Sequence, residues 1–199
     1  MEQRLCVSPG LIARQEQVIA LRQGGLQRIE AAVSPRVFAE LEQPAREIIR
    51  LVPARLQQIE TALRSAATIA LPLQPSIRDL RADHFLFEGD TLTGIVDFGS
   101  LRIESPVGDV ARALGSLVGD NTQLRNTALA AYEAVRPLSE NERLVLPTFD
   151  HSEVLLSAVN WLDWIYCQQR HFDNPAAVLA RVKVLLQRLH CLPSQGDFV

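Results

Sequence analysis

The chain has 199 residues, of which 47% are hydrophobic and 22% are charged, and its formal net charge is −3. That composition is typical of a folded globular protein, and the charge favours neither nucleic acid nor an anionic membrane as a partner. The three cysteines, Cys6, Cys167 and Cys191, form no C-x-x-C pair, so neither a zinc knuckle nor a disulfide framework is expected. No apolar run of about 18 residues and no signal-like N-terminus occurs, so we expect a cytoplasmic protein that does not span a membrane.

The first predicted element is a helix near the N-terminus. Apolar side chains recur near a 3.6-residue period between residues 11 and 29, which is the pattern of an amphipathic helix. Gly24 and Gly25 lie inside this pattern and weaken or divide the helix, because glycine costs about 1 kcal/mol in a helix interior. A glycine pair in a helical pattern also makes a poor cradle for phosphate.

Two further helices are predicted before residue 70. Ser34 and Pro35 are suited to be the N-cap and the first residue of one of them. A second helical pattern extends over residues 44–67, and Pro53 should break or kink it. We therefore expect residues 1–70 to be helical.

A β-hairpin is predicted in the middle of the chain. Residues 85–88 and 91–97 have strand-like composition, and Gly89 and Asp90 between them supply the turn. An isolated hairpin is marginally stable, so this one must pack on helices.

The rest of the chain is predicted to be helical. The pattern Ser139-Glu140-Asn141-Glu142 is a capping box, which marks a helix start. We expect helices over residues 108–118, 122–135, 139–169 and 175–189. The fold class predicted from these elements is α+β and mainly helical.

Residues 78–99 contain the pattern that indicates a chemical function. Asp79 precedes the hairpin and Asp97 opens Asp97-Phe98-Gly99 at its far end, so the hairpin should bring the two carboxylates together. Phosphoryl transfer uses one carboxylate to accept the proton of the attacking hydroxyl and another to hold a magnesium ion. In kinases a second metal ligand, normally Asn, follows the catalytic Asp by five residues, and here that position is His84.

This segment resembles the aminoglycoside phosphotransferase and choline-kinase-like superfamily. Members read His-Gly-Asp, a short spacer, Asn, a hairpin and then Ile-Asp-Phe or Ile-Asp-Trp, which Ile95-Val96-Asp97-Phe98-Gly99 matches well. The segment Pro106-Val107-Gly108-Asp109-Val110-Ala111-Arg112 matches the helix start that follows in the family. The resemblance is specific over residues 75–119, plausible to about residue 190, and weak over residues 1–70.

The resemblance implies a role for each matching residue. Asp79 is then the general base, Asp97 the main Mg²⁺ ligand and His84 the second ligand, while Asp109 braces the loop beside Arg78. The sequence departs from the family at two places, because Ile77-Arg78 replaces His-Gly and His84 replaces Asn. Magnesium prefers oxygen ligands, so His84 is open to other roles: it could bind a softer ion, contact a phosphate or serve the loop structurally.

The nucleotide lobe of a kinase has no counterpart in the sequence. Residues 1–70 contain no strand-rich sheet, no phosphate loop and no lysine. Lys183 is the only lysine in the sequence. The fold expected is therefore the C-terminal lobe of a protein-kinase-like fold with the N-terminal nucleotide lobe absent. We expect a helical connector or insert over residues 1–70, a catalytic lobe over residues 71–199, and weak or absent ATP binding. A fragment of a longer kinase, a chain that needs a partner lobe and an inactive relative all fit this pattern.

The acceptor site is placed by resemblance on the late helices. Asp150, Asp163 and Trp164 are the main candidates there, with Glu153 and Trp161 beside them, because acids and an indole suit a cationic amino-sugar or amino-alcohol. The alternative is that the acidic residues form a solvated helix face and the tryptophans pack in the core.

Three functions compete for this chain. The first is an ATP- and Mg²⁺-dependent phosphotransferase that acts on a small-molecule hydroxyl group. The second is a non-catalytic, pseudokinase-like binding module. The third is a metal-dependent hydrolase whose ligands are Asp79, Asp83, His84 and Asp97. Without a nucleotide lobe the apolar face of residues 9–70 would be exposed, so we also expect self-association or a partner lobe.

Overall fold

The computed structural model describes residues 5–193. The chain divides into two compact units by its internal contacts. One contains the residues up to Ala13 together with Ser65–Asp150, and the other contains Arg14–Arg64 together with the residues from His151 onward. The protein is mainly helical with a minor strand content, as predicted. The expected division into residues 1–70 and 71–199 stays a prediction.

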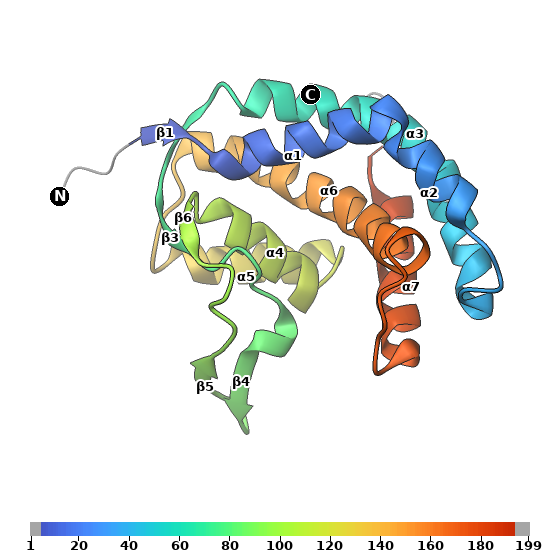
Figure 1. Ribbon diagram of the computed structural model, residues 1–199. Coiled ribbons are helices and arrows are strands. Elements are labelled where there is room, and N and C mark those ends of the chain that lie inside the picture. The colour runs from blue at the N-terminus through green and yellow to red at the C-terminus, as the bar shows by residue number, and fades with distance from the viewer. Residues whose placement is uncertain (1–4, 194–199) are drawn as a thin grey trace. The chain divides into compact units, whose positions relative to one another are not determined.

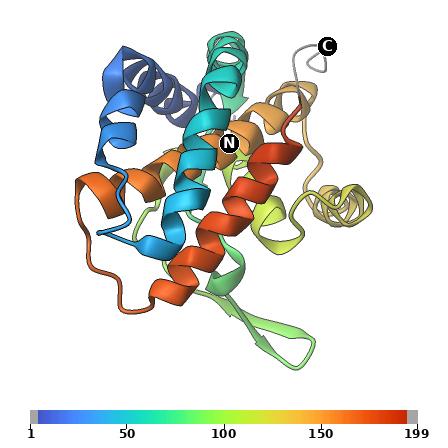
Figure 2. The ribbon, with the colours of Figure 1, turned by 90° about the vertical axis from the view of Figure 1, so that its right-hand side faces the viewer.

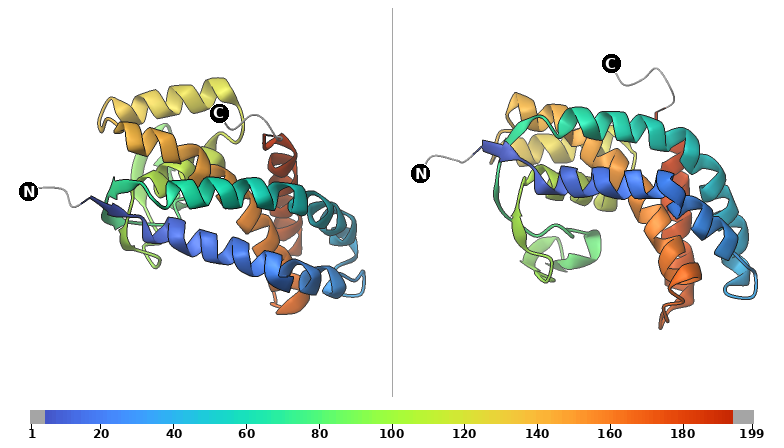
Figure 3. Two further views of the ribbon diagram at one scale, coloured as in Figure 1. Left: turned by 90° about the horizontal axis from the view of Figure 1, so that it is seen from above. Right: turned by 45° about the horizontal axis from the view of Figure 1, so that its top comes forward.

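The helices before residue 67 follow the apolar pattern. Helix α1 (Pro9–Ala20) continues through a π-helical turn, η1 (Leu21–Gly25), into α2 (Leu26–Ala32), and α3 (Glu42–Ala66) follows after a loop. The predicted weak point at the glycine pair is the π turn, where Gly24 adopts φ = 114°, a value that side-chain-bearing residues rarely reach. Figure 3 shows α1 and α2 running alongside α3, and an ion pair joins Arg22 to Glu60 between them.

The helix start expected at Ser34 and Pro35 is wrong. The turn that Ser34 and Pro35 begin stops after Val37, because Phe38 is extended (φ = −156°, ψ = 96°). A 3₁₀ turn, η2 (Ala39–Leu41), then leads into α3. Of the two effects expected of Pro53, a break is excluded because α3 continues through it as one element, and a kink stays a prediction.

The late helices complete the second unit. Helix α6 (Glu140–Leu162) ends in a π-helical turn, η4 (Asp163–Cys167), so the predicted helix over residues 139–169 changes its winding near its end. Helix α7 (Pro175–Cys191) is capped by Asn174, whose Oδ1 accepts a hydrogen bond from the Ala177 amide at 3.0 Å. Figure 2 shows α7 beside α3, and His190 Nε2 lies 2.9 Å from Glu47 Oε1 between them. The buried side chains of α7 are Val178, Val182, Leu185, Arg188 and Leu189.

The first unit holds the strands. The predicted hairpin is confirmed as β4 (Phe85–Glu88) and β5 (Thr91–Ile95), which are antiparallel and joined at Gly89 (φ = 58°). Figure 1 shows this hairpin extending from the helices around it. Two short antiparallel pairs were not predicted. They are β1 (Leu5–Val7) with β2 (Ala70–Pro72), and β3 (Gln74–Ser76) with β6 (Arg102–Glu104).

Short helices and a confirmed capping box follow the hairpin. Helix α4 (Val107–Leu117) and helix α5 (Thr122–Glu133) lie where the sequence predicts them. At the start of α6 the Ser139 amide donates to Glu142 Oε2 at 2.9 Å, and the Glu142 amide donates to Ser139 Oγ at 3.3 Å. Among the described helices, none has the length and apolar character needed to cross a membrane.

Candidate active site

The loop before the hairpin is held by a carboxylate at the start of α4. Asp109 Oδ2 accepts a hydrogen bond from the Ile77 amide at 2.7 Å, and Asp109 Oδ1 accepts one from the Arg78 amide at 2.6 Å. Burial raises the pKa of the Asp109 carboxyl, while these two amide donors and the nearby Arg112 charge act to lower it. Asp109 therefore fixes the two residues that directly precede Asp79.

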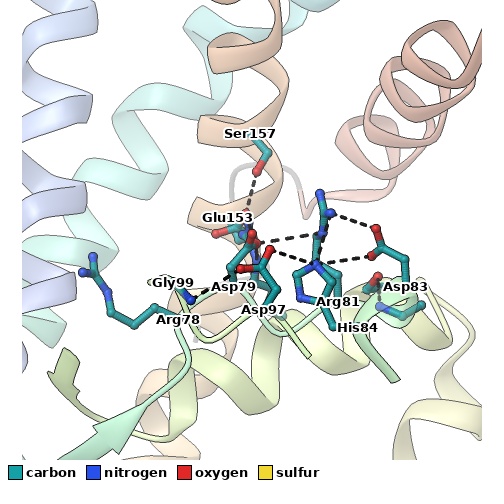
Figure 4. Close-up of polar contacts among 12 residues, drawn as sticks. Arg78, Asp79, Arg81, Asp83, His84, Asp97, Gly99, Glu153 and Ser157 are labelled. Atoms are coloured by element: carbon teal, nitrogen blue, oxygen red, sulfur yellow. Dashed lines mark hydrogen bonds and ion pairs between the residues drawn. The ribbon is translucent and has the colours of Figure 1, made fainter. Parts of the chain in front are cut away.

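Arg78 occupies a strained backbone position in this loop. Its φ is 68°, in the left-handed region where glycine is favoured and other residues are uncommon. The resemblance to the phosphotransferase motif also places glycine at this position. The Arg78 side chain points away from Asp79, Asp97 and His84 (Figure 4). Arg78 therefore contributes to the loop through its backbone conformation and not through its charge.

Asp79 lies against an arginine of α4. Arg112 Nε donates to Asp79 Oδ1 at 2.8 Å, and Arg112 Nη2 donates to the same oxygen at 2.5 Å. Arg81 approaches Asp79 Oδ1 less closely, with its Nε at 4.0 Å. Two hydrogen bonds from one guanidinium fix the orientation of the Asp79 carboxylate.

His84 is the buried member of the cluster. It ends the 3₁₀ turn η3 (Ala82–His84), and its side chain is 6% exposed. Its Nε2 lies 3.3 Å from Arg81 Nη2 and 3.6 Å from Asp97 Oδ2. The His84 carbonyl accepts a hydrogen bond from the Val96 amide at 3.0 Å, which connects the turn to the far end of the hairpin.

Asp97 also has a left-handed backbone, with φ = 64°. Its Oδ1 accepts a hydrogen bond from the Gly99 amide at 3.4 Å, and its side chain is 59% exposed. Asp79, His84 and Asp97 each offer one ligand atom, and these three atoms lie within 4.8 Å of one another. The hairpin thus brings the two carboxylates together as the sequence predicts, and Figure 4 shows the group.

The donor set of this cluster fits a divalent cation. Two carboxylates supply negative charge and oxygen ligands, and an imidazole supplies one nitrogen ligand. The other ring nitrogen, His84 Nδ1, is buried and has no hydrogen-bond partner within residues 5–193. Asp83, the spare carboxylate, pairs instead with Arg81 Nη2 at 2.8 Å.

The residues proposed for acceptor binding are already engaged in local contacts. Asp150 is buried and pairs with Arg125 at 2.9 Å in the first unit. In the second unit Asp163 pairs with Arg28 at 2.7 Å. There Trp164 packs edge-on against Trp161 at 5.3 Å, with Arg170 over its ring. A role for Asp150, Asp163 and Trp164 in acceptor binding stays a prediction.

Sequence reasoning named Asp109 as the brace of the loop but missed Arg112 and Ser116 on the same face of α4. Asp109, Arg112 and Ser116 follow an i, i+3, i+7 spacing, which places them on one side of a helix. Ser116 Oγ accepts a hydrogen bond from the Ala82 amide at 2.9 Å, so all three side chains bind the loop over residues 77–82. The signal was present in the sequence, because polar residues at this spacing interrupt an otherwise apolar helix.

The chain is similar to known phosphotransferases. The family model described as "Phosphotransferase enzyme family" matches residues 14–144. A homoserine kinase of Afipia carboxidovorans is 36% identical over 122 residues, which cover 58% of this chain and 37% of that protein. A homoserine kinase of Methylocella silvestris is 27% identical over 172 residues, which cover 82% of this chain and 51% of that protein. The chain therefore spans about half, or less, of the length of these relatives.

Proposed function

This chain belongs to the phosphotransferase enzyme family, and we propose that it carries the base and metal residues of a kinase for a small-molecule hydroxyl group. The phosphate donor in this proposal is ATP, and the cation is divalent. The observation that carries the proposal is the meeting of Asp79, His84 and Asp97 within 4.8 Å, at the positions that the kinase pattern assigns to a base and two metal ligands.

Asp79 is the proposed general base. Its carboxylate would accept a hydrogen bond from the acceptor hydroxyl, orient that oxygen toward the γ-phosphorus, and take its proton as the new P–O bond forms. The bond between the γ-phosphorus and the bridging oxygen then breaks, and ADP leaves. The two hydrogen bonds from Arg112 support this role because they hold the carboxylate in one orientation.

Asp97 and His84 would hold the cation, which neutralises phosphate charge when bound. Arg78 and Asp109 act on the loop that presents Asp79, through backbone conformation and the two amide hydrogen bonds. These assignments follow from the contacts of each side chain with the loop and the cluster.

The proposed acceptor is a small amino-alcohol. The relatives' names point to homoserine, which carries one hydroxyl, one amine and one carboxylate. A cationic amine suits the acidic and aromatic candidates Asp150, Asp163 and Trp164, and an amino-sugar remains within the same chemistry.

The nucleotide-binding half of the enzyme is proposed to lie outside these 199 residues, in further sequence or in a partner chain. This follows from the short span against the relatives and from the absence of a phosphate loop and of a lysine before Lys183. Self-association through residues 9–70 also stays a prediction, but the apolar side chains that were expected to be exposed there are buried, with Leu11, Val18 and Ile48 at 0% exposure.

A second candidate, a non-catalytic binding module, is favoured by one observation. Asp79 Oδ1 already accepts two hydrogen bonds from Arg112, so this oxygen is engaged before any acceptor hydroxyl binds. The two candidates differ in whether phosphate reaches an acceptor.

The test is phosphorylated product, measured by mass spectrometry after incubation of the chain with millimolar ATP, Mg²⁺ or Mn²⁺, and a panel of amino-alcohols that includes homoserine. We expect slow turnover that Asp79→Asn lowers by about 10²–10⁴-fold. Asp97→Asn should lower both turnover and affinity for the metal–nucleotide complex. Asp90→Asn, in the exposed hairpin turn, is the matched control.

Product formation that survives Asp79→Asn would exclude Asp79 as the base. Metal–nucleotide binding without product, for any acceptor in the panel, would favour the binding module.

A further inference from the structure

Arg81 lies against one ring nitrogen of the His84 imidazole. A guanidinium has only donors, so Arg81 Nη2, at 3.3 Å from His84 Nε2, requires a lone pair on that nitrogen. The carboxylates of Asp97 and Asp83 lie at 3.6 and 4.0 Å from Nε2, which is too far for a hydrogen bond from it. Nε2 is therefore the ring nitrogen that faces Arg81 and the carboxylates, while Nδ1 is buried and has no hydrogen-bond partner within residues 5–193.

The position of Nε2 suits metal binding, since it lies 3.6 Å from Asp97 Oδ2. A histidine ligand must offer an unprotonated nitrogen, and here that nitrogen faces the side of the ring where Asp97 and Asp79 lie. The ring can turn little, because its side chain is 6% exposed. Its lone pair is thus held toward the two carboxylates, with Arg81 as its present partner.

The mixed donor set bears on which cation fits. Mg²⁺ demands oxygen ligands in near-ideal octahedral geometry, while imidazole binds Mn²⁺ and later divalent metals more tightly along the Irving–Williams order. A site with Asn in place of His84 would offer oxygen only. The position of His84 therefore shifts the preference of this site away from Mg²⁺.

We infer that this cluster takes a first-row divalent cation such as Mn²⁺ in preference to Mg²⁺, and that the cation binds His84 Nε2 by displacing Arg81. The inference deepens the proposed function and rests on it. Arg81 has a place to remain once displaced, because its Nη2 also pairs with Asp83 at 2.8 Å. Arg81 is thus a competitor of the cation within the site.

The test uses the full chain without nucleotide. Binding of Mn²⁺ is measured by the loss of the free-ion electron paramagnetic resonance signal, and Mg²⁺ is measured by its competition with Mn²⁺. We expect Mn²⁺ to bind at least about tenfold more tightly than Mg²⁺, and His84→Asn to remove most of that ratio.

Two further variants separate the parts of the inference. Arg81→Met removes the competing donor and keeps the length of the side chain, so Mn²⁺ affinity should rise several-fold. His171→Asn changes a histidine whose side chain is 92% exposed, and it should leave the Mn²⁺ to Mg²⁺ ratio unchanged. The melting temperature of each variant is recorded, so that loss of fold is recognised.

The outcomes distinguish this inference from the proposed function. Equal affinity for the two cations, or a ratio that His84→Asn leaves unchanged, would overturn the inference while the kinase proposal stands. Loss of both cations in Asp97→Asn, with no effect of Arg81→Met, would overturn only the displacement of Arg81. Mn²⁺ affinity that neither Asp97→Asn nor His84→Asn changes would show that the cation does not bind at this cluster. Both proposals would then fail.

Discussion

Helix α7 and the loop with hairpin over residues 77–99 are stabilised in opposite ways. Helix α7 buries Val182, Leu185 and Leu189 and keeps ordinary helical geometry, so apolar packing holds it. In the loop and hairpin, two residues other than glycine have a left-handed backbone, and large apolar side chains are exposed, with Phe87 at 58% and Phe98 at 52%. Polar contacts from α4 hold that segment instead.

This difference teaches where strain is tolerated. A backbone conformation that is unfavourable for its residue type persists when surrounding contacts hold it in place. Such positions are common at functional sites. Here the contacts are the bonds from Asp109, Arg112 and Ser116 to the loop. The same loop carries Asp79, the proposed base, so the strained backbone lies in the segment of the proposed chemistry.

The largest effect on stability should come from the packed region. Leu189 is fully buried, so Leu189→Ala should lower the free energy of unfolding by about 2–5 kcal/mol through lost burial and a cavity. Val184→Ala on the same helix, where the side chain is 46% exposed, should change it by less than about 0.5 kcal/mol. Urea titration measures both. If Leu189→Ala also changed the affinity for Mn²⁺ in a chain that is still folded, the two regions would not be independent.

A smaller loss of stability with a larger loss of function is expected in the loop. Asp109→Ala leaves the part-buried Ile77 amide and the exposed Arg78 amide without their acceptor, which should cost about 0.5–1.5 kcal/mol. The loop should then release Asp79, and Mn²⁺ binding should fall. Asp90→Ala is the control. Unaltered Mn²⁺ affinity in Asp109→Ala would show that the hydrogen bonds of Asp109 do not position the metal ligands.

The smallest effect should be a gain. Arg78→Gly removes a side chain from a left-handed position, which relieves about 1–2 kcal/mol of backbone strain. This relief is larger than the entropy cost of introducing glycine. We expect a net stabilisation of about 0.5 kcal/mol, measured as a raised urea midpoint. Arg78→Ala keeps the Cβ atom and so serves as the matched control without a gain. A stabilisation of the same size in Arg78→Ala would assign the effect to charge rather than to the backbone.

Local patterns predicted much of this molecule. The hairpin, helices α4 and α5, and the capping box at Ser139 depend on residues close in sequence, so spacing and turn chemistry were enough to find them. The prediction failed at Ser34, where a valid cap pattern begins a turn that does not continue past Val37. It also missed β6, a three-residue strand whose partner, β3, is distant in sequence.

The sequence by itself predicted that Asp79, His84 and Asp97 lie together, because they stand at spacings that a hairpin closes. Only the tertiary structure decided how they are held. The bonds from α4 to the loop join residues 31 to 34 positions apart, and no local pattern encodes them. The contact of Arg81 with His84 likewise depends on side-chain orientation, which the fold fixes by burying the imidazole. The cation preference inferred above follows from that orientation.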